Sequence, residues 1–463
     1  MRIVLINPSQ TAELFPDVYL PVNIAYIAAS LQRYQHKIKI IDLQIECKSI
    51  EELRSEIKMF NPHVVGITSM TPNFPHALKI AELVKKINKN IKTVFGGIHV
   101  TTMPKETLQN KYVDFVVIGE GEETILELVN TIQYKKSLKN VKGIGFKKNG
   151  KIIINSFRPY IKDLNKLQFP AYDIVNMEEY KKYKNGILIL TSRGCPFNCI
   201  FCASHLTTGK KIRRRSIENV LEELKFLKNK YEVKRIAFYD DTFTLDKKYV
   251  IELCERMIEE NLTFEWWCNT RVDTVDEELL KWMKNAGCNE VSYGFESGTQ
   301  RVLDYIKKSF RIEEARKAIK MTKKIGIDIH GFFIINFPNE TKKEMMNTIM
   351  FARKMPLKGF RFSLATPYPG TELYKICKKN NCLSKEQEKN WEKYSYLKNF
   401  YIHNFYMSEN DLKKLLRKTN IMLILNTTYL KSMFTKIMRR LLNGDFHVFV
   451  RGLRYLRNIL TIK

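Results

Sequence analysis

Short apolar runs alternate with helical patterns in two successive blocks of the chain, and this alternation limits the fold more than any other feature. In the first block, five apolar runs of strand length are separated by segments with helical spacing. The runs cover residues 3–6, 38–41, 64–67, 93–95 and 115–118. Strands that alternate with helices are typical of an α/β fold with a parallel sheet. We therefore predict a doubly wound, Rossmann-like sheet over residues 1–135.

The second block has six further apolar runs and lies within residues 186–375. These runs cover residues 186–191, 235–239, 264–269, 290–295, 327–335 and 359–364. Six β/α units predict a partial or complete TIM-type barrel, whose chemistry takes place at the carboxyl ends of the strands. Residues 136–185 contain a short hairpin pattern and then a stretch dotted with Pro and Tyr, which we interpret as a linker. Residues 376–463 show no strand alternation and predict a basic helical tail.

Polar and glycine residues follow the strands of the first block. Ligands of open parallel sheets bind beyond the carboxyl ends of the strands, so we expect these residues to line a ligand site. We expect His99, in the same region, to lie at the polar rim of the sheet. The candidate ligand-binding residues are Asn7, Ser69, Thr71, Gly96, Gly97, Gly119, Glu120 and Gly121.

The chain carries 78 Lys and Arg against 49 Asp and Glu, a net charge of +29. A positive field favours anionic partners such as nucleic acid, phospholipid or phosphorylated substrates. The excess is spread along the chain, so compositional drift explains it equally well. No apolar run reaches the roughly 18 residues that span a bilayer. The first ten residues indicate a buried strand and not a signal peptide, so we predict a cytoplasmic protein.

Three of the nine cysteines fall within eight positions, at Cys195, Cys199 and Cys202. This compact group is typical of a metal or cluster site in a reducing compartment and not of a disulfide framework. Three thiolates can hold a 4Fe–4S cluster that keeps one iron open for reaction. They can also form a closed zinc site with His205 as the fourth ligand. Spacing alone leaves both possibilities open.

The C-x3-C-x2-C spacing, with Phe201 before the third cysteine, resembles the signature of the radical S-adenosylmethionine (SAM) enzymes. The downstream segments RRRSIENVLEEL, IAFYDDTF, WWCNTRVD, VSYGFESGTQRVLDYIKK, GFFIINFPNET and TPYPGTELY resemble one subfamily of these enzymes. In that subfamily the barrel follows a cobalamin-binding domain, and INP, PVNIAYIAASL, VVGITSMT, VFGGIHVT and VVIGEGEET occur in the matching order. The resemblance to the cobalamin-dependent radical SAM enzymes covers residues 1 to about 380.

The resemblance implies that the three cysteines bind three irons of a 4Fe–4S cluster, which cleaves SAM to methionine and a 5′-deoxyadenosyl radical. It implies that Phe201 lies near the adenine, where its alternative role is loop packing. Glu296 and Ser297 would contact the ribose and methionine parts of SAM, although Glu296 could instead form an ion pair at the barrel rim. Asp240 and Asp241 would orient SAM or the substrate, or would cap the next helix.

The resemblance further implies that cobalamin binds at the ligand edge of the first sheet. The chain has no D-x-H-x-x-G motif, so no histidine takes the usual position below the cobalt. An alternative is that the first sheet has lost cofactor binding and serves as a scaffold or lid. The segment 331–340 departs from the family because Asn336 and Asn339 replace glycine. Since Asn tolerates the left-handed region, we expect the turn to be kept.

The function implied is radical methylation of an unactivated carbon in a small-molecule or lipid-like substrate. Related enzymes with the same two domains carry out ring formation or rearrangement without methyl transfer, which is the alternative reaction. The resemblance also implies an electron donor such as flavodoxin or ferredoxin. The tail segments 434–442 and 446–459 mix apolar residues with Arg. They suggest either peripheral contact with the inner face of the membrane or a solvated helix that covers the barrel.

Two hypotheses from other classes remain to be weighed. A radical SAM enzyme that modifies RNA would explain the positive charge. The methylthiolating subclass needs three more cysteines in the first domain, where only Cys47 occurs, and no RNA-binding module is recognisable. We therefore expect no specific nucleic-acid partner. A zinc-stapled basic binding protein would explain the cysteines and the charge, but not the ordered motifs at successive strand ends.

Overall fold

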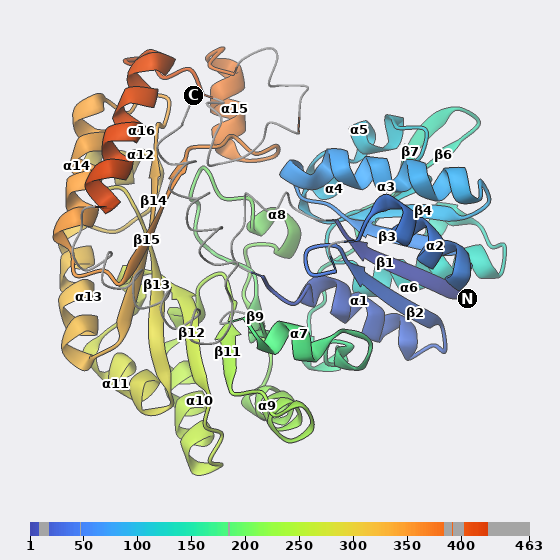
Figure 1. Cartoon of the computed structure of the whole chain (residues 1–463), viewed down its shortest axis with the longest axis horizontal. Coiled ribbons are helices and arrows are strands. Elements are labelled where there is room, and N and C mark those ends of the chain that lie inside the picture. The colour runs from blue at the N-terminus through green and yellow to red at the C-terminus, as the bar shows by residue number, and fades with distance from the viewer. Residues whose placement is uncertain (9–17, 47, 184–185, 384–390, 392–401, 425–463) are drawn as a thin grey trace.

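The computed structural model describes residues 1–8, 18–46, 48–183, 186–383, 391 and 402–424. Two α/β units lie side by side, one around each of two sheets (Figure 1). The expected helical tail is described only in α15 (Glu372–Lys379) and α16 (Glu409–Ile424). The segments 434–442 and 446–459, which suggested membrane contact, lie outside the described residues.

The first sheet has seven strands in the order β2-β1-β3-β4-β5-β6-β7. Its parallel part confirms the predicted doubly wound α/β fold, and all five predicted runs are strands. The strands are β1 (Arg2–Asn7), β2 (Lys37–Asp42), β3 (Val64–Thr68), β4 (Lys92–Gly96) and β5 (Phe115–Val117). The order 2-1-3-4-5 reverses direction between β1 and β3, and such a switch point is where open α/β sheets bind ligands.

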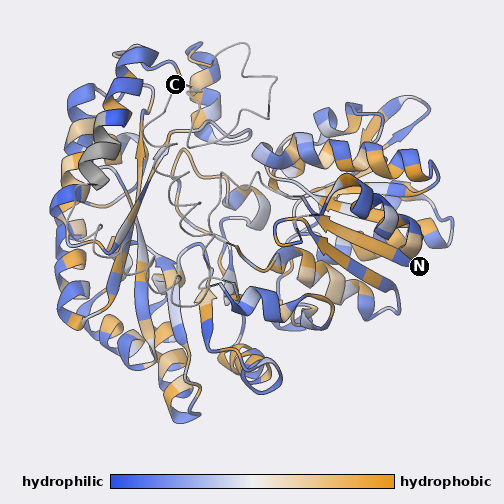
Figure 2. Cartoon of the chain, viewed as in Figure 1, coloured by the Kyte–Doolittle hydropathy of each residue, from blue (hydrophilic) through white to orange (hydrophobic). Residues whose placement is uncertain are grey.

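Helices cover both faces of this sheet because its strands are apolar on both sides. Figure 2 shows β1 hydrophobic along most of its length. The side chains of Ile3 and Leu5 pack with one helical layer, and those of Val4 and Ile6 pack with the other. The first layer holds α1 (Val22–Gln32) and α6 (Glu122–Gln133), and the second holds α2 (Ile50–Phe60), α3 (Phe74–Ile87), α4 (Ile98–Thr102) and α5 (Pro104–Gln109).

The hairpin expected at the start of the linker segment forms, but it extends the first sheet. It consists of β6 (Ile144–Lys148) and β7 (Lys151–Ile154). β6 pairs antiparallel with β5, with Phe146 opposite Phe115. The pairing satisfies backbone groups that an edge strand at β5 would leave open. This part of residues 136–185 therefore belongs structurally to the first sheet, whereas the short α7 (Met177–Lys181) follows it.

The second sheet has six parallel strands in the order β15-β14-β13-β12-β11-β8. β8 and β15 are its two edges, so it is the partial barrel that we predicted, and each of the six predicted runs contributes a strand. The strands are β8 (Leu188–Ile189), β11 (Arg235–Phe238), β12 (Glu265–Thr270), β13 (Cys288–Glu296), β14 (Asp328–Ile335) and β15 (Gly359–Leu364).

Helices cover the outer face of this second sheet (Figure 1). Polar caps begin several of them, since the side chains of Ser216, Asp246, Asp276 and Thr341 accept hydrogen bonds from the first turns. Each cap ends a strand-to-helix loop and so fixes its geometry. The helices are α9 (Ile217–Tyr231), α10 (Lys247–Glu259), α11 (Glu277–Asn285), α12 (Gln300–Tyr305), α13 (Ile312–Ile325) and α14 (Lys342–Lys354).

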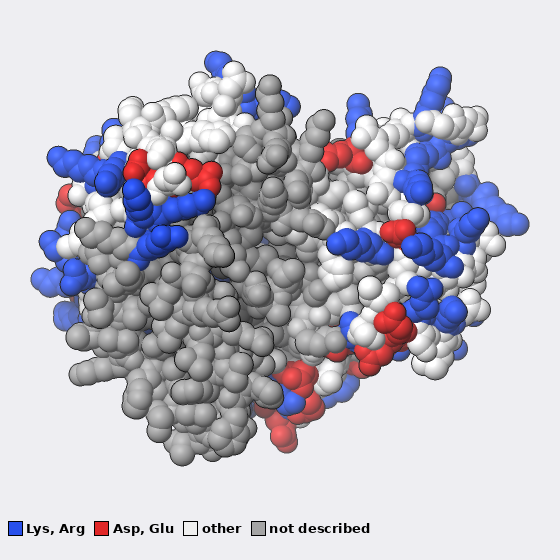
Figure 3. Space-filling view, turned by 45° about the horizontal axis from the view of Figure 1, so that its top comes forward, with Lys and Arg blue, Asp and Glu red and all other residues white. Residues whose placement is uncertain are grey.

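The surface charge is mixed. Figure 3 shows Lys and Arg side chains spread over this face of the molecule, with Asp and Glu among them. No single basic block dominates the described part of that face, as the even spread along the sequence suggested. Within the described residues, none of the helices is long and apolar enough to cross a bilayer.

Candidate active site between the two sheets

The cysteine loop leaves the second sheet just after β8 and is closed by a short antiparallel pair. This pair joins β9 (Ser192–Arg193) to β10 (Arg213–Arg214). Gly194 has a φ of +102°, and a Cβ there would lie 2.3 Å from the carbonyl oxygen of Lys211, so only glycine fits. The backbone N–H of Cys195 donates to the carbonyl of Gly209 at 3.2 Å. The loop, with the short helix α8 (His205–Thr208), is therefore held at the carboxyl end of the sheet.

The three cysteines are free thiols in this loop. Cys199 is buried, and Cys195 and Cys202 are half-buried. Burial raises the pKa of the Cys195 thiol and raises that of Cys202 to about 12, so both are protonated at neutral pH without metal. Metal binding would release these protons, because the thiolate is the ligand. While protonated and sheltered from solvent, these thiols are unreactive. This is compatible with a role as ligands of a resident iron–sulfur cluster.

The closed zinc alternative would need the thiols and His205 to converge on one ion. Among the described side chains, no three His, Cys, Asp or Glu residues are placed to hold a single metal ion. A 4Fe–4S cluster makes a different demand, since each cysteine binds a different iron and the thiols surround a volume. The three thiols lie in one loop of eight residues, so we assign this second kind of site to them.

Arg271 is a site residue that the sequence analysis did not single out. Its Nη1 lies 4.0 Å from Sγ of Cys199, and its guanidinium carbon lies 3.6 Å from the centre of the Phe197 ring. Its Nε and Nη2 donate to Asp273 at 2.9 and 2.7 Å. The only sequence signal was a basic residue just past a predicted strand. The fixed positive charge therefore lies directly beside the buried thiol.

Glu296 ends β13 and forms a buried ion pair with Lys308 at 2.8 Å. The strand is irregular here, and Glu296 has a φ of +61°, which is unusual for a residue with a side chain. A Cβ on Gly294 would lie 2.5 Å from Oε1 of Glu296 and 2.8 Å from Nζ of Lys308. Gly294 therefore provides the space for the pair. The structure shows the ion pair that was the alternative role for Glu296.

The other candidate SAM-binding residues divide into two groups. Phe201 contacts the ring of Phe337 at a centroid distance of 6.1 Å, and the exposed Asp241 accepts a hydrogen bond from Ser204. Both remain at the mouth of the partial barrel. The polar atoms of Asp240 and Ser297 are used in internal hydrogen bonds.

Asp240 is 1% exposed and accepts hydrogen bonds from the side chains of Thr191 and Ser192 at 2.9 and 2.5 Å. It therefore holds the strand that leads into the cysteine loop, and it does not cap the next helix, whose N-cap is Asp246. The hydroxyl of Ser297 pairs with that of Thr348 at 3.0 Å and is fully buried. These two side chains support the site without facing it.

At the first sheet, the predicted ligand edge is assembled but partly closed by its own hydrogen bonds. The amide of Asn7 donates to Asp42 at 2.9 Å, and Ser69 is fully buried. His99 does not lie at the rim, as we expected, but is buried against Phe74 with its Nδ1 3.2 Å from the hydroxyl of Thr71. Burial lowers the pKa of His99 to about 3, so its ring is neutral.

The glycines at this edge of the sheet differ in backbone conformation and in the space around a Cβ atom. Gly97 has a φ of +98°, and a Cβ there would lie 2.6 Å from the carbonyl oxygen of Ser69, so backbone packing requires it. A Cβ on Gly96 would meet no atom within 4 Å. Gly119 also has a positive φ, and its Cβ would press on Phe157 at 3.1 Å. The open space at Gly96 is room in which a corrin tail could approach the backbone.

Glu120 lies at the contact between the two units. Its carboxylate is 3.0 Å from Arg193 and 2.9 Å from Arg213, both of which flank the cysteine loop. Glu122, in the same turn, lies 2.5 Å from Arg193. Since its side chain is used in this way, Glu120 could contribute to a ligand site only through its backbone. The two predicted cofactor edges are thus physically joined.

The turn after β14 keeps the geometry expected despite the loss of glycine. Asn336 has a φ of +71°, which confirms that Asn takes the left-handed position there, whereas Asn339 has no positive φ. The carboxylate of Glu340 accepts a hydrogen bond from the backbone N–H of Phe337 at 3.1 Å. Burial raises the pKa of Glu340 to about 8, so this carboxyl group is mostly protonated at neutral pH.

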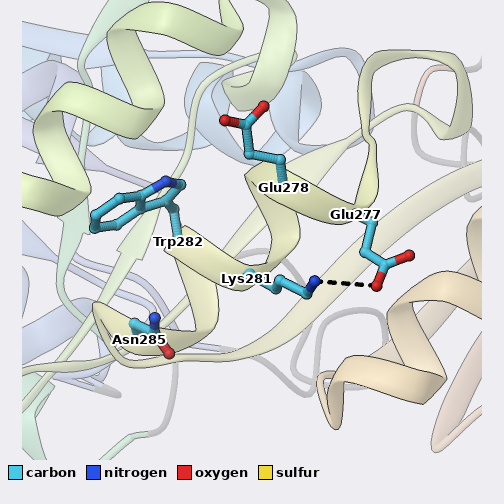
Figure 4. A pocket seen from close by; sticks show the side chains of 5 residues that line it. All are labelled: Glu277, Glu278, Lys281, Trp282 and Asn285. Atoms are coloured by element: carbon cyan, nitrogen blue, oxygen red, sulfur yellow. Dashed lines mark ion pairs between the residues drawn. The ribbon is translucent and has the colours of Figure 1, made fainter.

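A surface hollow on α11 lies away from this site. Five residues of that helix line it, and Lys281 is paired there with Glu277 (Figure 4). All five lining side chains come from one helix. None of them is a cysteine, and no glycine-rich turn borders the hollow. The hollow has none of the features of the candidate active site.

Two family models match the chain in the regions just described. The model for the B12 binding domain matches residues 13–129. The model for the Radical SAM superfamily matches residues 189–352. The first match covers the parallel strands β2 to β5 of the seven-stranded sheet, and the second covers the cysteine loop and most of the partial barrel.

Relatives with similar sequences extend along almost the whole chain. An uncharacterized methyltransferase of Pyrococcus horikoshii is 38% identical and covers 98% of this chain and 99% of its own length. Cytidylyl-2-hydroxyethylphosphonate methyltransferase of Streptomyces wedmorensis is 31% identical, with 83% of each chain covered. Anaerobic magnesium-protoporphyrin IX monomethyl ester cyclase of Rubrivivax gelatinosus is also 31% identical, over 81% of this chain and 69% of its own.

Solved structures agree on the fold. The radical S-adenosylmethionine methyltransferase TsrM from Kitasatospora setae superposes with a TM-score of 0.73 at 15% identity, covering 91% of this chain and 88% of its own. The cobalamin-dependent S-adenosylmethionine radical enzyme OxsB superposes with a TM-score of 0.74 at 17% identity, covering 94% of this chain and 66% of its own. At such identities the agreement concerns the arrangement of the two units.

Proposed function

The chain belongs to the cobalamin-dependent radical SAM enzymes, and on this premise we propose that it is a methyltransferase that acts on an unactivated carbon of a small molecule. Membership sets aside the zinc-stapled binding protein and establishes an enzyme that uses SAM, cobalamin and a 4Fe–4S cluster. One observation carries the choice of methyl transfer. A relative named as a methyltransferase is 38% identical over essentially the full length of both chains.

We assign the cluster to the cysteine loop. Cys195, Cys199 and Cys202 would bind three irons, and Arg271 would lie beside the second thiolate. The buried pair of Glu296 and Lys308 sits at the end of β13, where its charges would face the polar part of SAM. Asp241 and Phe201 would border the same space. The chain's own role is to bind, orient and exclude water.

Cobalamin would lie along the carboxyl edge of the first sheet. Gly96 leaves room for close approach, and Ser69, Thr71 and the turn from Gly119 to Gly121 border the same edge. When bound, the cluster supplies the electron that cleaves SAM, and cobalamin supplies the transferable methyl group. His99 has its ring nitrogen turned to Thr71 and is buried, so we assign it to packing and not to the cobalt.

A second reaction is favoured by one specific observation. The magnesium-protoporphyrin cyclase is 31% identical over 81% of this chain, nearly as similar as the named methyltransferase of Streptomyces. Ring formation without methyl transfer would use the same two units. The two reactions differ in what becomes of SAM, and that difference is the basis of the test.

The test begins with protein purified without oxygen from cells supplied with cobalamin. Iron, sulfide, cobalt and zinc are measured, and about four irons with one cobalt per chain are expected. The loaded enzyme, with a reduced flavodoxin or ferredoxin as donor, is then given SAM with a deuterated methyl group and the substrates that the relatives' names specify. Methyl transfer predicts a deuterated product and S-adenosylhomocysteine in equal amounts. 5′-Deoxyadenosine together with a ring-closed product that carries no deuterium, and without S-adenosylhomocysteine, would support the cyclase reaction and overturn methyl transfer.

A further inference from the structure

A buried ion-pair network joins the turn after β5 to the base of the cysteine loop. Arg193 places Nη1 3.0 Å from Oε1 of Glu120 and Nη2 2.5 Å from Oε1 of Glu122. Nη1 of Arg213 lies 2.9 Å from each carboxylate oxygen of Glu120. The four side chains are between 6% and 9% exposed. Four charges are thus removed from water at the contact between the two units.

Each end of this network adjoins a predicted cofactor edge. Arg193 is separated from Cys195 by a single residue, Gly194, and pairs in β9 with Arg213 of β10. Glu120 and Glu122 lie in the turn that begins α6. In Figure 1, α8 and β9 lie between the two sheets, so the cysteine loop faces the first unit directly. A shift of the turn would therefore reach the cysteines through a short and stiff connection.

The network has little freedom to rearrange. Arg213 also donates to the carbonyl oxygens of Ile161 and Thr208, both at 2.6 Å. The second carboxylate oxygen of Glu122 is buried and has no hydrogen-bond partner among the described residues. Although burial opposes its charge, Arg193 holds the pKa of Glu122 below its usual range. Removing one partner would leave an uncompensated buried charge, which is far more costly than losing a surface pair.

We propose that Arg193 is a positioning residue that fixes the cysteine loop against the turn from Gly119 to Glu122, and thereby sets the distance between the cluster and the corrin. The inference rests on the proposed function, because it assigns these two edges to the two cofactors. Arg193 touches neither reacting group. It acts through the loop and the turn, and its bidentate reach to two carboxylates is what a lysine cannot reproduce.

The need for such a device follows from the reaction class. A substrate that must meet groups from two separate units requires both to be held within a fraction of an ångström of the productive geometry. Interfaces between units in one chain are by default mobile. A buried ion-pair network that spans the interface restricts the relative motion of the two units next to both predicted cofactor sites.

The first test is amide hydrogen exchange on the full chain loaded with its cofactors. Arg193→Gln is expected to raise exchange at least tenfold in both residues 119–124 and residues 194–212. The control is Lys85→Gln, which disrupts the partly buried pair of Lys85 and Asp114, with 13% and 27% side-chain exposure, at the amino end of β5 and away from both segments. The control is expected to change exchange in those two segments less than twofold. Equal effects of both variants would overturn the proposal.

The second test measures the magnetic interaction between cob(II)alamin and the reduced cluster by pulsed electron paramagnetic resonance. Wild type is expected to give one narrow distance distribution, Arg193→Gln a broad one, and Arg193→Lys an intermediate one, at unchanged iron and cobalt content. A distance distribution like that of the wild type in a fully loaded Arg193→Gln protein would overturn the proposal that Arg193 sets this distance.

Two further outcomes are separable. Wild-type protein that binds no cobalt or no iron would overturn the proposed function, whatever the exchange rates show. Should Arg193→Gln fail to fold, Glu122→Gln keeps an oxygen acceptor opposite Arg193 and removes one charge. It is then expected to show the same broadening and faster exchange at a smaller amplitude, and wild-type behaviour in that variant would overturn the proposal.

Discussion

Arg271 and Cys199, which are 72 positions apart in the chain, meet at the carboxyl end of the partial barrel, where a guanidinium nitrogen lies 4.0 Å from the thiol sulfur. Arg271 is only 4% exposed. Its guanidinium stacks on the ring of Phe197, a residue inside the cysteine motif. A positive charge next to a ligand sulfur stabilises the more negative, reduced state of a cluster.

We predict that Arg271→Gln makes the cluster harder to reduce and lowers SAM cleavage by about 10- to 100-fold, the usual effect of losing a partner next to a metal ligand. A redox titration followed by electron paramagnetic resonance measures the potential directly. Arg271→Lys keeps the charge and should recover part of the shift. Arg256→Gln, at a half-buried arginine on α10 that is far from the cysteine loop in the sequence, is the control and should leave the potential unchanged. An unchanged potential in Arg271→Gln would contradict the assignment.

Alanine at each of Cys195, Cys199 and Cys202 should abolish the cluster, because three thiolates are the minimum set that holds it. Iron content after anaerobic reconstitution and the visible absorption of the cluster are the measurements. Cys254→Ala, in the buried face of α10, is the control and should cost about 1 kcal/mol of stability while keeping the iron. Iron retained in all three loop variants would refute the ligand set.

The two adjacent glycines of the first sheet should respond differently to alanine. Gly96→Ala meets no protein atom and should leave the melting temperature within about 2 °C while weakening cobalamin binding, since the methyl group enters the open space. Gly97→Ala places a methyl group 2.6 Å from a backbone oxygen at positive φ and should destabilise the unit by more than about 1 kcal/mol. Absorbance titration with hydroxocobalamin and thermal unfolding separate the two effects. Equal cobalamin affinity in Gly96→Ala and wild type would contradict the assignment of cobalamin to this edge of the first sheet.

Lys308→Met should leave Glu296 as an unpaired buried charge and lower the free energy of unfolding by about 3–5 kcal/mol, with loss of SAM binding. The neighbouring pair of Lys307 and Glu372 is a matched control, because its side chains are 48% and 45% exposed. Lys307→Met should therefore cost less than about 1 kcal/mol. Urea unfolding and equilibrium dialysis with SAM give the two quantities. Similar costs for the two lysines would show that the Glu296 pair is not desolvated in solution.

Glu340 predicts a pH dependence of stability. Burial raises its pKa from 4.5 to about 8, so between these values the folded chain keeps a proton that the unfolded chain has released. The free energy of unfolding should fall as pH rises through this window, by up to about 1.4 kcal/mol per pH unit, and level off above pH 8. Glu340→Gln should lack this part of the slope. The comparison is made by urea unfolding of both proteins from pH 5 to 9, and parallel curves would contradict the prediction.

Much of the fold was accessible from the sequence because strand and helix patterns are local. The eleven predicted apolar runs each contribute a strand to one of the two sheets. The hairpin of β6 and β7 was recognised as a hairpin, but its pairing with β5 was not. Sequence shows that a strand exists, whereas the edge it joins depends on which backbone groups remain open in the folded sheet.

The candidate site was accessible in part. The cysteine spacing and the resemblance selected the loop after β8 as the candidate cluster site, and the left-handed turn at Asn336 was expected and is present. The roles of individual polar side chains were less accessible. Asp240 was a candidate for SAM and turns out to hold the strand before the cysteine loop, and His99 was expected at the rim and is buried. Arg271 was missed because nothing in its local sequence indicates that Phe197 and Cys199 lie beside it.

The sequence by itself determined the two α/β units, the order of their strands along the chain and the family, and it pointed to three cysteines as the candidate ligands. These depend on periodicity and on short motifs, which need only neighbouring residues. Only the tertiary structure decided the ion pairs of Arg193 with Glu120 and Glu122, and of Glu296 with Lys308. A charged residue has no local signature of its partner, because the energy of a buried pair depends on desolvation and distance, which exist only after the chain has folded.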